Sequence, residues 1–279
     1  MENIMLTQNH IIMFRNYLEE QEKSAATIEK YLRDVRKFYL FMEQRYVSKE
    51  LVIAYKQLLL NEKYAVRSIN SMLASVNSFL QFIGLQECKV KQLKLQREMF
   101  CSEEKELTRK EYQCLVEAAG SNQKMRLIIQ TICATGIRVS ELKYFTVESV
   151  RRGSVMVSCK GKLRPVFMPE KLKKQLIKYA SDQNIHSGSL FVTRNGKVLD
   201  RSYIWAEMKK LCTRAGINPT KVFPHNLRKL FARAFYEVEK DIAKLADILG
   251  HSSINTTRIY IISSGIEHRK KIDRLKLVF

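Results

Sequence analysis

Apolar side chains recur every three or four positions through much of the first 100 residues, which is the spacing of one buried face of an α-helix. The clearest stretches are 28–42, preceded by the capping residue Ser24, and 66–83, ended by Gly84. Two shorter segments repeat the pattern, and no proline interrupts it. The spacing predicts a compact bundle of about four helices.

A mixed pattern follows residue 107. Helical spacing is expected over 109–119, 124–135, 139–145, 170–181 and most of 202–258. Short β-rich runs predict strands over 154–158 and 164–168 and a further hairpin over 190–199. The fold class is therefore mainly α with a small β-sheet.

A polar, charge-rich stretch separates the two patterns, and it is typical of an interdomain linker. We expect a helical domain over 1–92, a linker over 93–106 and a mixed α/β domain with a C-terminal tail over 107–279. Thr108 and Glu111 have the spacing of a capping box, which predicts where the first helix of the second domain begins.

The net charge of the chain limits the classes of binding partner. The chain holds 49 Lys and Arg against 28 Asp and Glu, a net charge of +21 at pH 7, and most of the excess lies after residue 100. This balance favours a polyanion as the partner: DNA, RNA or an anionic membrane surface. The apolar fraction of 46% argues against disorder as the main state.

Compartment and redox state follow from the same composition. No apolar run approaches the roughly 20 residues that span a bilayer, and the N-terminus lacks the pattern of a secretory signal. The six cysteines form no C-x-x-C pair, so reduced, buried thiols in a cytoplasmic protein are favoured over disulfides or a zinc site.

Two motifs in the first half of the second domain carry candidate chemistry. In residues 134–142 (ATGIRVSEL), Gly136 ends one helix and places Arg138 near the start of the next, where free N–H groups favour anions. Taken alone, Arg138 paired with Glu141 on a solvated face is the more common arrangement. The turn of Lys160 and Lys162 could reach a phosphate or donate a proton, or be a charged hairpin tip.

Two further motifs lie near the C-terminus. In residues 224–228 (PHNLR), His225 and Arg228 share one face of a helix and could clamp a phosphate. In residues 249–260 (LGHSSINTTRIY), His251 follows a glycine and Tyr260 ends the run. The two histidines lack a third ligand at a matching short spacing, which argues against a metal site.

These four motifs, in this order and spacing, resemble the tyrosine recombinases of the phage integrase family, closely over about 107–262. The resemblance implies a two-domain clamp that closes on opposite sides of a DNA duplex, with residues 1–92 as the core-DNA-binding domain. It also implies a site-specific recombinase that cleaves and rejoins DNA through a covalent 3′-phosphotyrosine, with no cofactor and no metal.

The resemblance assigns a role to each matching position. Two arginines grip the scissile phosphate, a lysine of the hairpin turn protonates the leaving 5′-oxygen, two histidines assist, and a tyrosine attacks. In this sequence these residues are Arg138, Arg228, Lys160 (with Lys162 as the alternative), His225, His251 and Tyr260. The departure from the family pattern is Lys229-Leu230, where His-Ser or His-Thr is common, and it affects packing rather than catalysis.

The expected partners are double-stranded recombination sites, further copies of the chain in a tetramer on DNA, and an accessory or partner recombinase. The sequence does not distinguish integration or excision, inversion and resolution as the biological outcome of recombination. A recombinase of the Xer-like or small mobile-element type is favoured. Two other functions remain in view: a non-catalytic DNA-binding protein of the same fold and a type IB topoisomerase-like enzyme.

Overall fold

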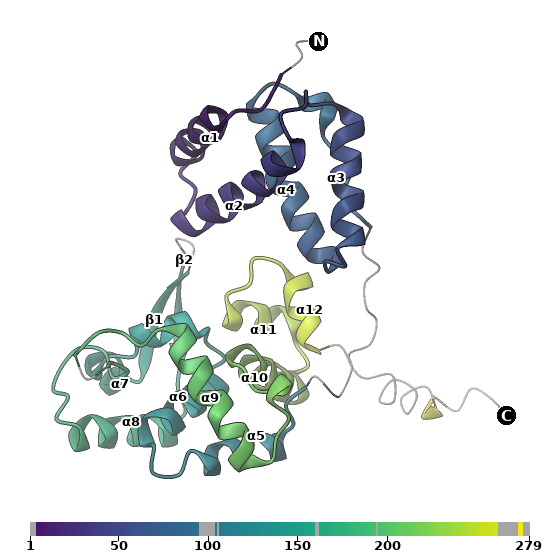
Figure 1. Cartoon of the computed structure of the whole chain (residues 1–279). Helices are drawn as coiled ribbons and strands as arrows, with labels where there is room; N and C mark the ends of the chain where they lie inside the picture. The colour runs from purple at the N-terminus through teal and green to yellow at the C-terminus, as the bar shows by residue number, and fades with distance from the viewer. Residues whose placement is uncertain are drawn as a thin grey trace. The chain divides into compact units, whose positions relative to one another are not determined.

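The chain divides into two compact units, Met1–Arg97 and Glu98–Phe279 (Figure 1). The computed structural model describes residues 4–94, 104, 106–159, 162–193, 195–261 and 273–275. The expected linker and the C-terminal tail therefore lie largely outside the described residues. Each unit has its own hydrophobic core.

The first unit is a helical bundle, as the apolar spacing predicted. Its elements are α1 (Gln8–Glu20), α2 (Ala25–Met42), α3 (Lys49–Asn61), α4 (Val66–Phe82) and the short 3₁₀ helix η1 (Gln86–Cys88). The side chain of Ser24 accepts a hydrogen bond from Thr27 N and so begins α2. Buried aromatic rings join the helices, with Phe14 against Phe79 and Phe38 against Tyr55 in edge-to-face contacts.

Two asparagines of α4 hold the chain that leaves the bundle. Asn77 exchanges hydrogen bonds with the backbone N–H and carbonyl of Val90, at 3.0 and 2.8 Å. Asn70 does the same with Leu93, at 2.7 and 2.9 Å. A side-chain amide presents one donor and one acceptor together, so each asparagine pairs with a residue's backbone N–H and carbonyl as a neighbouring β-strand would. The chain as far as Leu93 is thus attached to the first unit.

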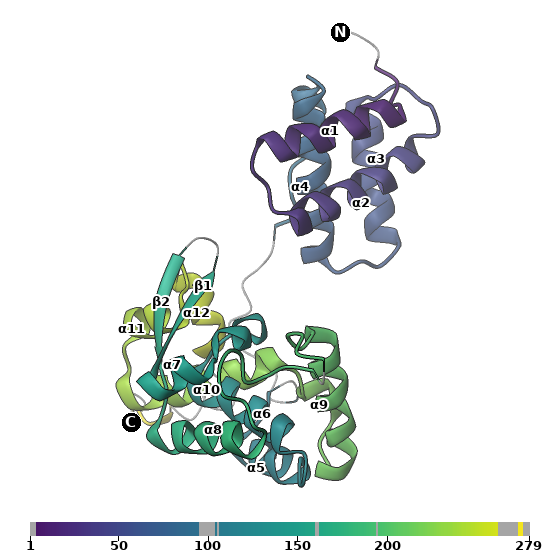
Figure 2. The same ribbon diagram turned by 90° about the vertical axis from the view of Figure 1, so that its left-hand side faces the viewer.

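The second unit combines helices with one hairpin (Figure 2). Its helices are α5 (Arg109–Ala118), α6 (Gln123–Thr135), α7 (Val147–Arg152), α8 (Glu170–Asp182), α9 (Arg201–Ala215), α10 (Pro224–Glu239), α11 (Ile242–Leu249) and α12 (Ile254–Ile261), with the 3₁₀ helices η3 (Val139–Tyr144) and η4 (Pro219–Lys221). The expected capping box is present: Thr108 accepts from Glu111 N, and Glu111 accepts from Thr108 N.

The strands β1 (Ser154–Cys159) and β2 (Lys162–Phe167) pair in an antiparallel ladder, in which Val157 lies opposite Arg164. Side chains alternate across such a ladder, so Val155, Val157 and Val166 are buried while Leu163 and Phe167 are exposed. The hairpin lies beside α11 in Figure 2, and a hydrogen bond from Arg164 to the Ile248 carbonyl joins them.

The structure refines two expectations for this unit. The segment expected as a helix over 139–145 is the 3₁₀ helix η3, which has tighter turns than an α-helix. The hairpin expected over 190–199 is present but short: Val192 and Val198 form one antiparallel bridge, with hydrogen bonds from Thr193 N to the Lys197 carbonyl and from Leu199 N to the Phe191 carbonyl on either side.

Packing in this unit forms one large core and one small one. The large core surrounds α6, in which eight residues are buried. A separate cluster consists of Ala232, Leu245, Leu249 and Tyr260, contributed by α10, α11 and α12. Among the described residues no helix is long and apolar enough to cross a membrane.

Candidate active site

Gly136 shapes the turn that presents Arg138. It ends α6 with φ +65°, a left-handed conformation that favours glycine. A Cβ at this position would lie 2.3 Å from the Phe231 ring, so only glycine fits between the turn and α10. Arg138 follows as the residue before η3 and turns its guanidinium toward the Glu141 carboxylate, 3.0 Å from Nη1 to Oε1.

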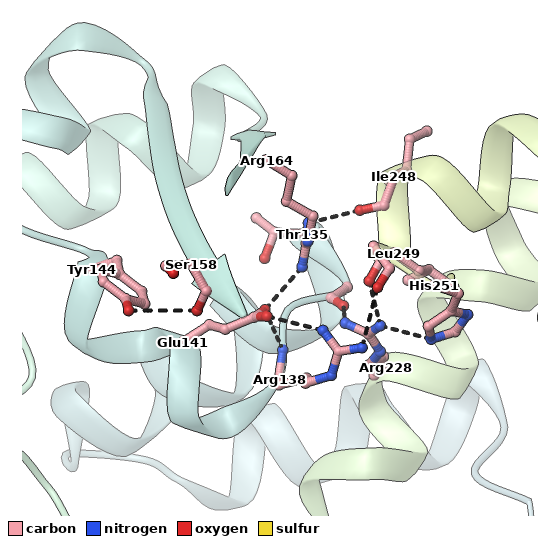
Figure 3. Close-up of polar contacts among 12 residues, drawn as sticks. Thr135, Arg138, Glu141, Tyr144, Ser158, Arg164, Arg228, Ile248, Leu249 and His251 are labelled. Carbon is pink, nitrogen blue, oxygen red and sulfur yellow. Dashed lines mark hydrogen bonds and ion pairs between the residues drawn. The ribbon is translucent and has the colours of Figure 1, made fainter. Parts of the chain in front are cut away.

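Glu141 is the buried acid of the site, with 2% of its surface exposed. Its Oε2 accepts from the Arg138 N–H at 2.9 Å and from Arg164 Nη2 at 2.8 Å. The pairing of Arg138 with Glu141 that sequence spacing allowed is therefore present, but the pair lies at a buried junction rather than on a solvated face. Figure 3 shows Glu141 between the two arginines.

Arg228 is the most deeply buried cation of the site, with 2% exposure, and it extends from the first turn of α10. Nη1 donates to the Gly136 carbonyl at 2.5 Å, and Nη2 donates to the Leu249 carbonyl at 2.6 Å (Figure 3). Burial and the nearby charge of Arg138 lower its pKa, and Tyr260 opposes that shift. Because the ordinary pKa of arginine is above 12, the group stays charged at neutral pH.

His251 receives a hydrogen bond from Arg228, with 2.9 Å between its Nε2 and the guanidinium Nη2. A guanidinium has only donors, so Nε2 is the acceptor and the proton sits on Nδ1, which donates to Thr257 Oγ1 at 2.8 Å. Burial, followed by the charges of the neighbouring arginines, lowers the pKa of His251 to about 4. The ring is therefore neutral at pH 7.

Tyr260 lies on α12 with 5% exposure, between two imidazoles. Its ring centroid is 5.2 Å from that of His225 and 5.4 Å from that of His251. Partial burial of the His225 ring and the positive charge of Arg228 lower the pKa of His225, so this imidazole also favours its neutral form. His251 uses both ring nitrogens, Nε2 for Arg228 and Nδ1 for Thr257, so His225 is the candidate base of the two.

A cavity of about 700 Å³ connects these groups. Arg138, His225, Arg228 and Tyr260 line one part of it. Arg201 and Trp205, on α9, line another part. Two guanidiniums, those of Arg138 and Arg164, share the Glu141 carboxylate, and Arg228 bonds to main-chain carbonyls and His251 instead. Three cations therefore accompany one carboxylate in this region, and the excess of positive charge suits an anionic ligand.

The structure brings together five of the six residues that the motifs singled out: Arg138, His225, Arg228, His251 and Tyr260. Lys160 lies outside the described residues, as does the side chain of its alternative, Lys162. Among the described residues no three His, Cys, Asp or Glu side chains gather at metal-binding distances.

Sequence reasoning missed several residues of this region. Arg201 and Trp205 line the cavity, and their only signal was an arginine and a lone tryptophan one helical turn apart. Arg164 was assigned only to a strand. Lys229, where the chain departs from the family pattern, pairs with the buried Glu106 at 2.5 Å, and Arg233 pairs with the same carboxylate.

Comparison with known proteins identifies the family. The phage integrase family matches residues 105–265, and the N-terminal SAM-like domain of phage integrases matches residues 11–87. The chain therefore belongs to the phage integrase family, as its motifs indicated. It is a tyrosine-type site-specific recombinase, an enzyme that breaks and rejoins DNA strands.

Relatives and solved structures agree over nearly the whole chain. The tyrosine recombinase XerA of Pyrococcus furiosus is 29% identical over 276 residues, which cover 95% of this chain and 93% of that protein. A crystal structure of XerA recombinase matches with a TM-score of 0.55 at 27% identity and covers 98% of this chain and all of the other. A lambda integrase tetramer bound to a Holliday junction matches with a TM-score of 0.74 at 14% identity, over 93% of this chain and 78% of that one.

Proposed function

We propose that Tyr260 is the nucleophile of this recombinase and that it forms a covalent 3′-phosphotyrosine with the cleaved strand. The observation that carries the proposal is the position of its ring, which lies against two imidazoles with lowered pKa values and lines the same cavity as two arginines. A phenol has an ordinary pKa near 10, so attack at neutral pH needs a base and neighbouring positive charge.

His225 is the proposed base. Its ring is in edge contact with Tyr260, and its lowered pKa keeps it neutral and able to accept the phenolic proton. Oη of Tyr260 then bonds to phosphorus while the bond from phosphorus to the 5′-oxygen breaks. Lys160 is the proposed donor of the proton that the leaving 5′-oxygen takes up. Attack by the 5′-hydroxyl of a second strand reverses these transfers and rejoins the DNA.

Arg138 and Arg228 are the proposed ligands of the scissile phosphate. Both guanidiniums line the cavity. Glu141 holds that of Arg138, and the main-chain carbonyls of Gly136 and Leu249 hold that of Arg228. Groups held in advance stabilise charge that develops in the transition state without a cost of reorganisation. His251 supports this function through Arg228, because it accepts a hydrogen bond from Nη2.

The proposal extends to the DNA beside the cleaved phosphate. Arg201 and Trp205 stand one turn apart at the start of α9, and Trp205 is 49% exposed although it is the one tryptophan of the chain. An arginine and an aromatic ring on one helix face suit a phosphate and a sugar or base of the flanking strand. They extend the site along the substrate.

We also propose a tetramer on two recombination sites, action in the cytoplasm and a Xer-like programme of integration, inversion or resolution. The family and the net charge of +21 support DNA as the substrate. The lambda integrase tetramer of like fold supports assembly on DNA. A partner recombinase belongs to the same proposal.

The test is the substitution Tyr260→Phe, which keeps the ring but removes the attacking oxygen. The substrate is a nicked duplex that carries a site selected from genomic DNA by the protein itself, and EDTA is present throughout. We expect the wild-type protein to give a covalent protein–DNA band on a denaturing gel and Tyr260→Phe to give none, with DNA binding retained.

Tyr236→Phe is the matched control, because Tyr236 lies in the same unit and its ring faces Lys240 rather than the cavity. It should give the wild-type band. A covalent band at wild-type yield from Tyr260→Phe would reject the assignment of the nucleophile. Activity that EDTA abolishes and magnesium restores would reject the metal-free mechanism.

A further inference from the structure

Arg164 is a buried arginine that does not line the active-site cavity. It lies on β2 with 11% of its side chain exposed. Nη2 bonds to Glu141 Oε2 at 2.8 Å, and Nη1 donates to the carbonyl of Ile248 at 2.6 Å. The Arg164 guanidinium therefore joins η3 to the end of α11, although its two partners, Glu141 and Ile248, are 107 residues apart in the sequence.

The first of these contacts leads to Arg138. Glu141 bonds to Arg138 through both carboxylate oxygens: Oε1 accepts from the guanidinium and Oε2 accepts from the backbone N–H. Arg164 bonds to the same Oε2 and so fixes the direction of the carboxylate. Without Arg164, Glu141 could rotate, and the guanidinium of Arg138 would rotate with it.

The second contact leads to Arg228. Ile248 directly precedes Leu249, whose carbonyl accepts from Arg228 Nη2, and it stands three residues before His251, which accepts from the same nitrogen. The hydrogen bond from Arg164 to the Ile248 carbonyl therefore fixes the position of the backbone segment that carries both acceptors of Arg228. Figure 3 shows Arg164 between Glu141 and Ile248.

Gly250 makes room for this arrangement. It has φ +65°, and a Cβ there would lie 2.6 Å from Cδ and 2.7 Å from Nε of Arg164. The stem of Arg164 thus packs directly on the backbone that carries the acceptors of Arg228. Such a close fit allows little freedom to either partner.

We propose that Arg164 is a positioning residue for the cleavage reaction, which aligns both phosphate-binding arginines through Glu141 and the segment 248–251. Arg164 lies on β2, which begins two residues after Lys160 in the sequence. The inference rests on the proposed function of Arg138 and Arg228 as ligands of the scissile phosphate.

The experiment compares Arg164→Gln with the wild-type protein in single-turnover cleavage of the nicked substrate at saturating DNA concentration. One substrate carries the natural phosphate at the scissile position, and a second carries a neutral methylphosphonate. A misalignment of about 1 Å costs about 100-fold in rate, and we expect a loss of that size on the phosphate. On the methylphosphonate, which has less charge for the arginines to stabilise, we expect a loss at least about tenfold smaller.

Arg109→Gln is the matched control, because Arg109 also pairs with a carboxylate, that of Glu237 at 2.6 Å, but at an exposed position. It should leave both rates unchanged. Thermal melting verifies the fold of each variant. If Arg164→Gln does not fold, Arg164→Lys replaces it, since lysine keeps the charge but cannot hold two acceptors in a fixed fork.

Equal losses on the two substrates would overturn the proposal, because they would mean that Arg164 supports the fold in general. An unchanged rate on the phosphate would overturn it too. A wild-type protein that forms no covalent band on the natural phosphate would instead reject the proposed function, so the two failures are distinguishable.

Discussion

Asp34 in the first unit and Glu141 in the second are both almost fully buried carboxylates, yet they connect very different things. Asp34 bonds to Lys30 at 2.8 Å, one turn away on the same helix, and to Ser75 of α4 at 3.0 Å. Its contacts therefore join two neighbouring helices. Glu141 holds Arg138 and Arg164, and through them it joins η3, β2 and the end of α11.

The two carboxylates differ in whether they belong to the candidate active site. A buried acid paired with a base is weak evidence for function by itself, because ion pairs also occur in purely structural cores. Each acid has a base that lines a cavity: Lys30 lines one with Tyr64, and Arg138 lines the other with Tyr260. Glu141 differs in that its cavity also brings a histidine and a second arginine beside the tyrosine. Removing the two carboxylates should therefore have different consequences.

The largest effect is expected from Glu141→Gln and Asp34→Asn, measured side by side. Glu141→Gln leaves two guanidiniums without a buried counter-charge, so it should cost about 3 kcal/mol of unfolding free energy and reduce cleavage about 100-fold. Asp34→Asn should cost about 1–3 kcal/mol and leave the cleavage rate of bound enzyme within about twofold. Urea unfolding and single-turnover cleavage measure the two quantities. Equal loss of cleavage in both variants would contradict the comparison.

A smaller contrast is expected between two glycines. Gly250 and Gly84 both have positive φ, of +65° and +81°. A Cβ at Gly250 would collide with Arg164, whereas nothing lies within 4 Å of one at Gly84. Gly84→Ala should therefore cost only the backbone penalty of about 1–2 kcal/mol. Gly250→Ala adds a steric clash, and it should lower both the melting temperature and the cleavage rate further. Comparable melting and cleavage in the two variants would show that the contact with Arg164 is loose.

The smallest effect concerns pH. The pKa of His251 is about 4 in the folded protein, lowered by burial and by Arg228, Arg138 and Arg164, whereas an unfolded histidine has a pKa near 6.5. Acid therefore protonates the unfolded chain first. The stability that neutral His251 contributes is complete above about pH 6.5 and is lost as the pH falls toward about 4.

His251→Gln removes this titration. The free energy of unfolding of the variant should fall less steeply between pH 6.5 and 4 than that of the wild-type protein. Denaturant unfolding at intervals of pH measures both slopes. Parallel slopes would mean that His251 takes up its proton at an ordinary pKa in the folded state.

The sequence predicted most of what depends on local rules. Apolar spacing and side-chain caps located helices in both units, since Ser24, at the start of α2, and Thr108, at the start of α5, act within three residues of themselves. The motifs also named the five described residues that meet at the site. They could do so because glycine stops and a proline start, at Gly136 and Pro224, fix where each motif turns.

What sequence reasoning missed depends on distant contacts. The burial of Glu141 follows from Arg164, 23 positions later, and the role of Arg164 follows from Ile248, 84 positions later. No local pattern distinguishes such an arginine from one that faces solvent. The 3₁₀ form of η3 is another detail that apolar spacing does not predict, because both kinds of helix bury one face.

The small hydrophobic cluster around Tyr260 has an energetic consequence. Tyr260, the proposed nucleophile, lies in a cluster separate from the large core around α6. Its neighbours there are the buried Ala232, Leu245 and Leu249 and the partly buried Phe231, Phe235, Tyr236 and Ile261. Parts of a protein with few buried apolar contacts open at a fraction of the global free energy. The helix that bears the tyrosine can thus undergo sub-global opening while α6 keeps its amide protons protected. The proposed covalent link to a DNA strand would therefore form on a helix that belongs to the smaller core of this unit.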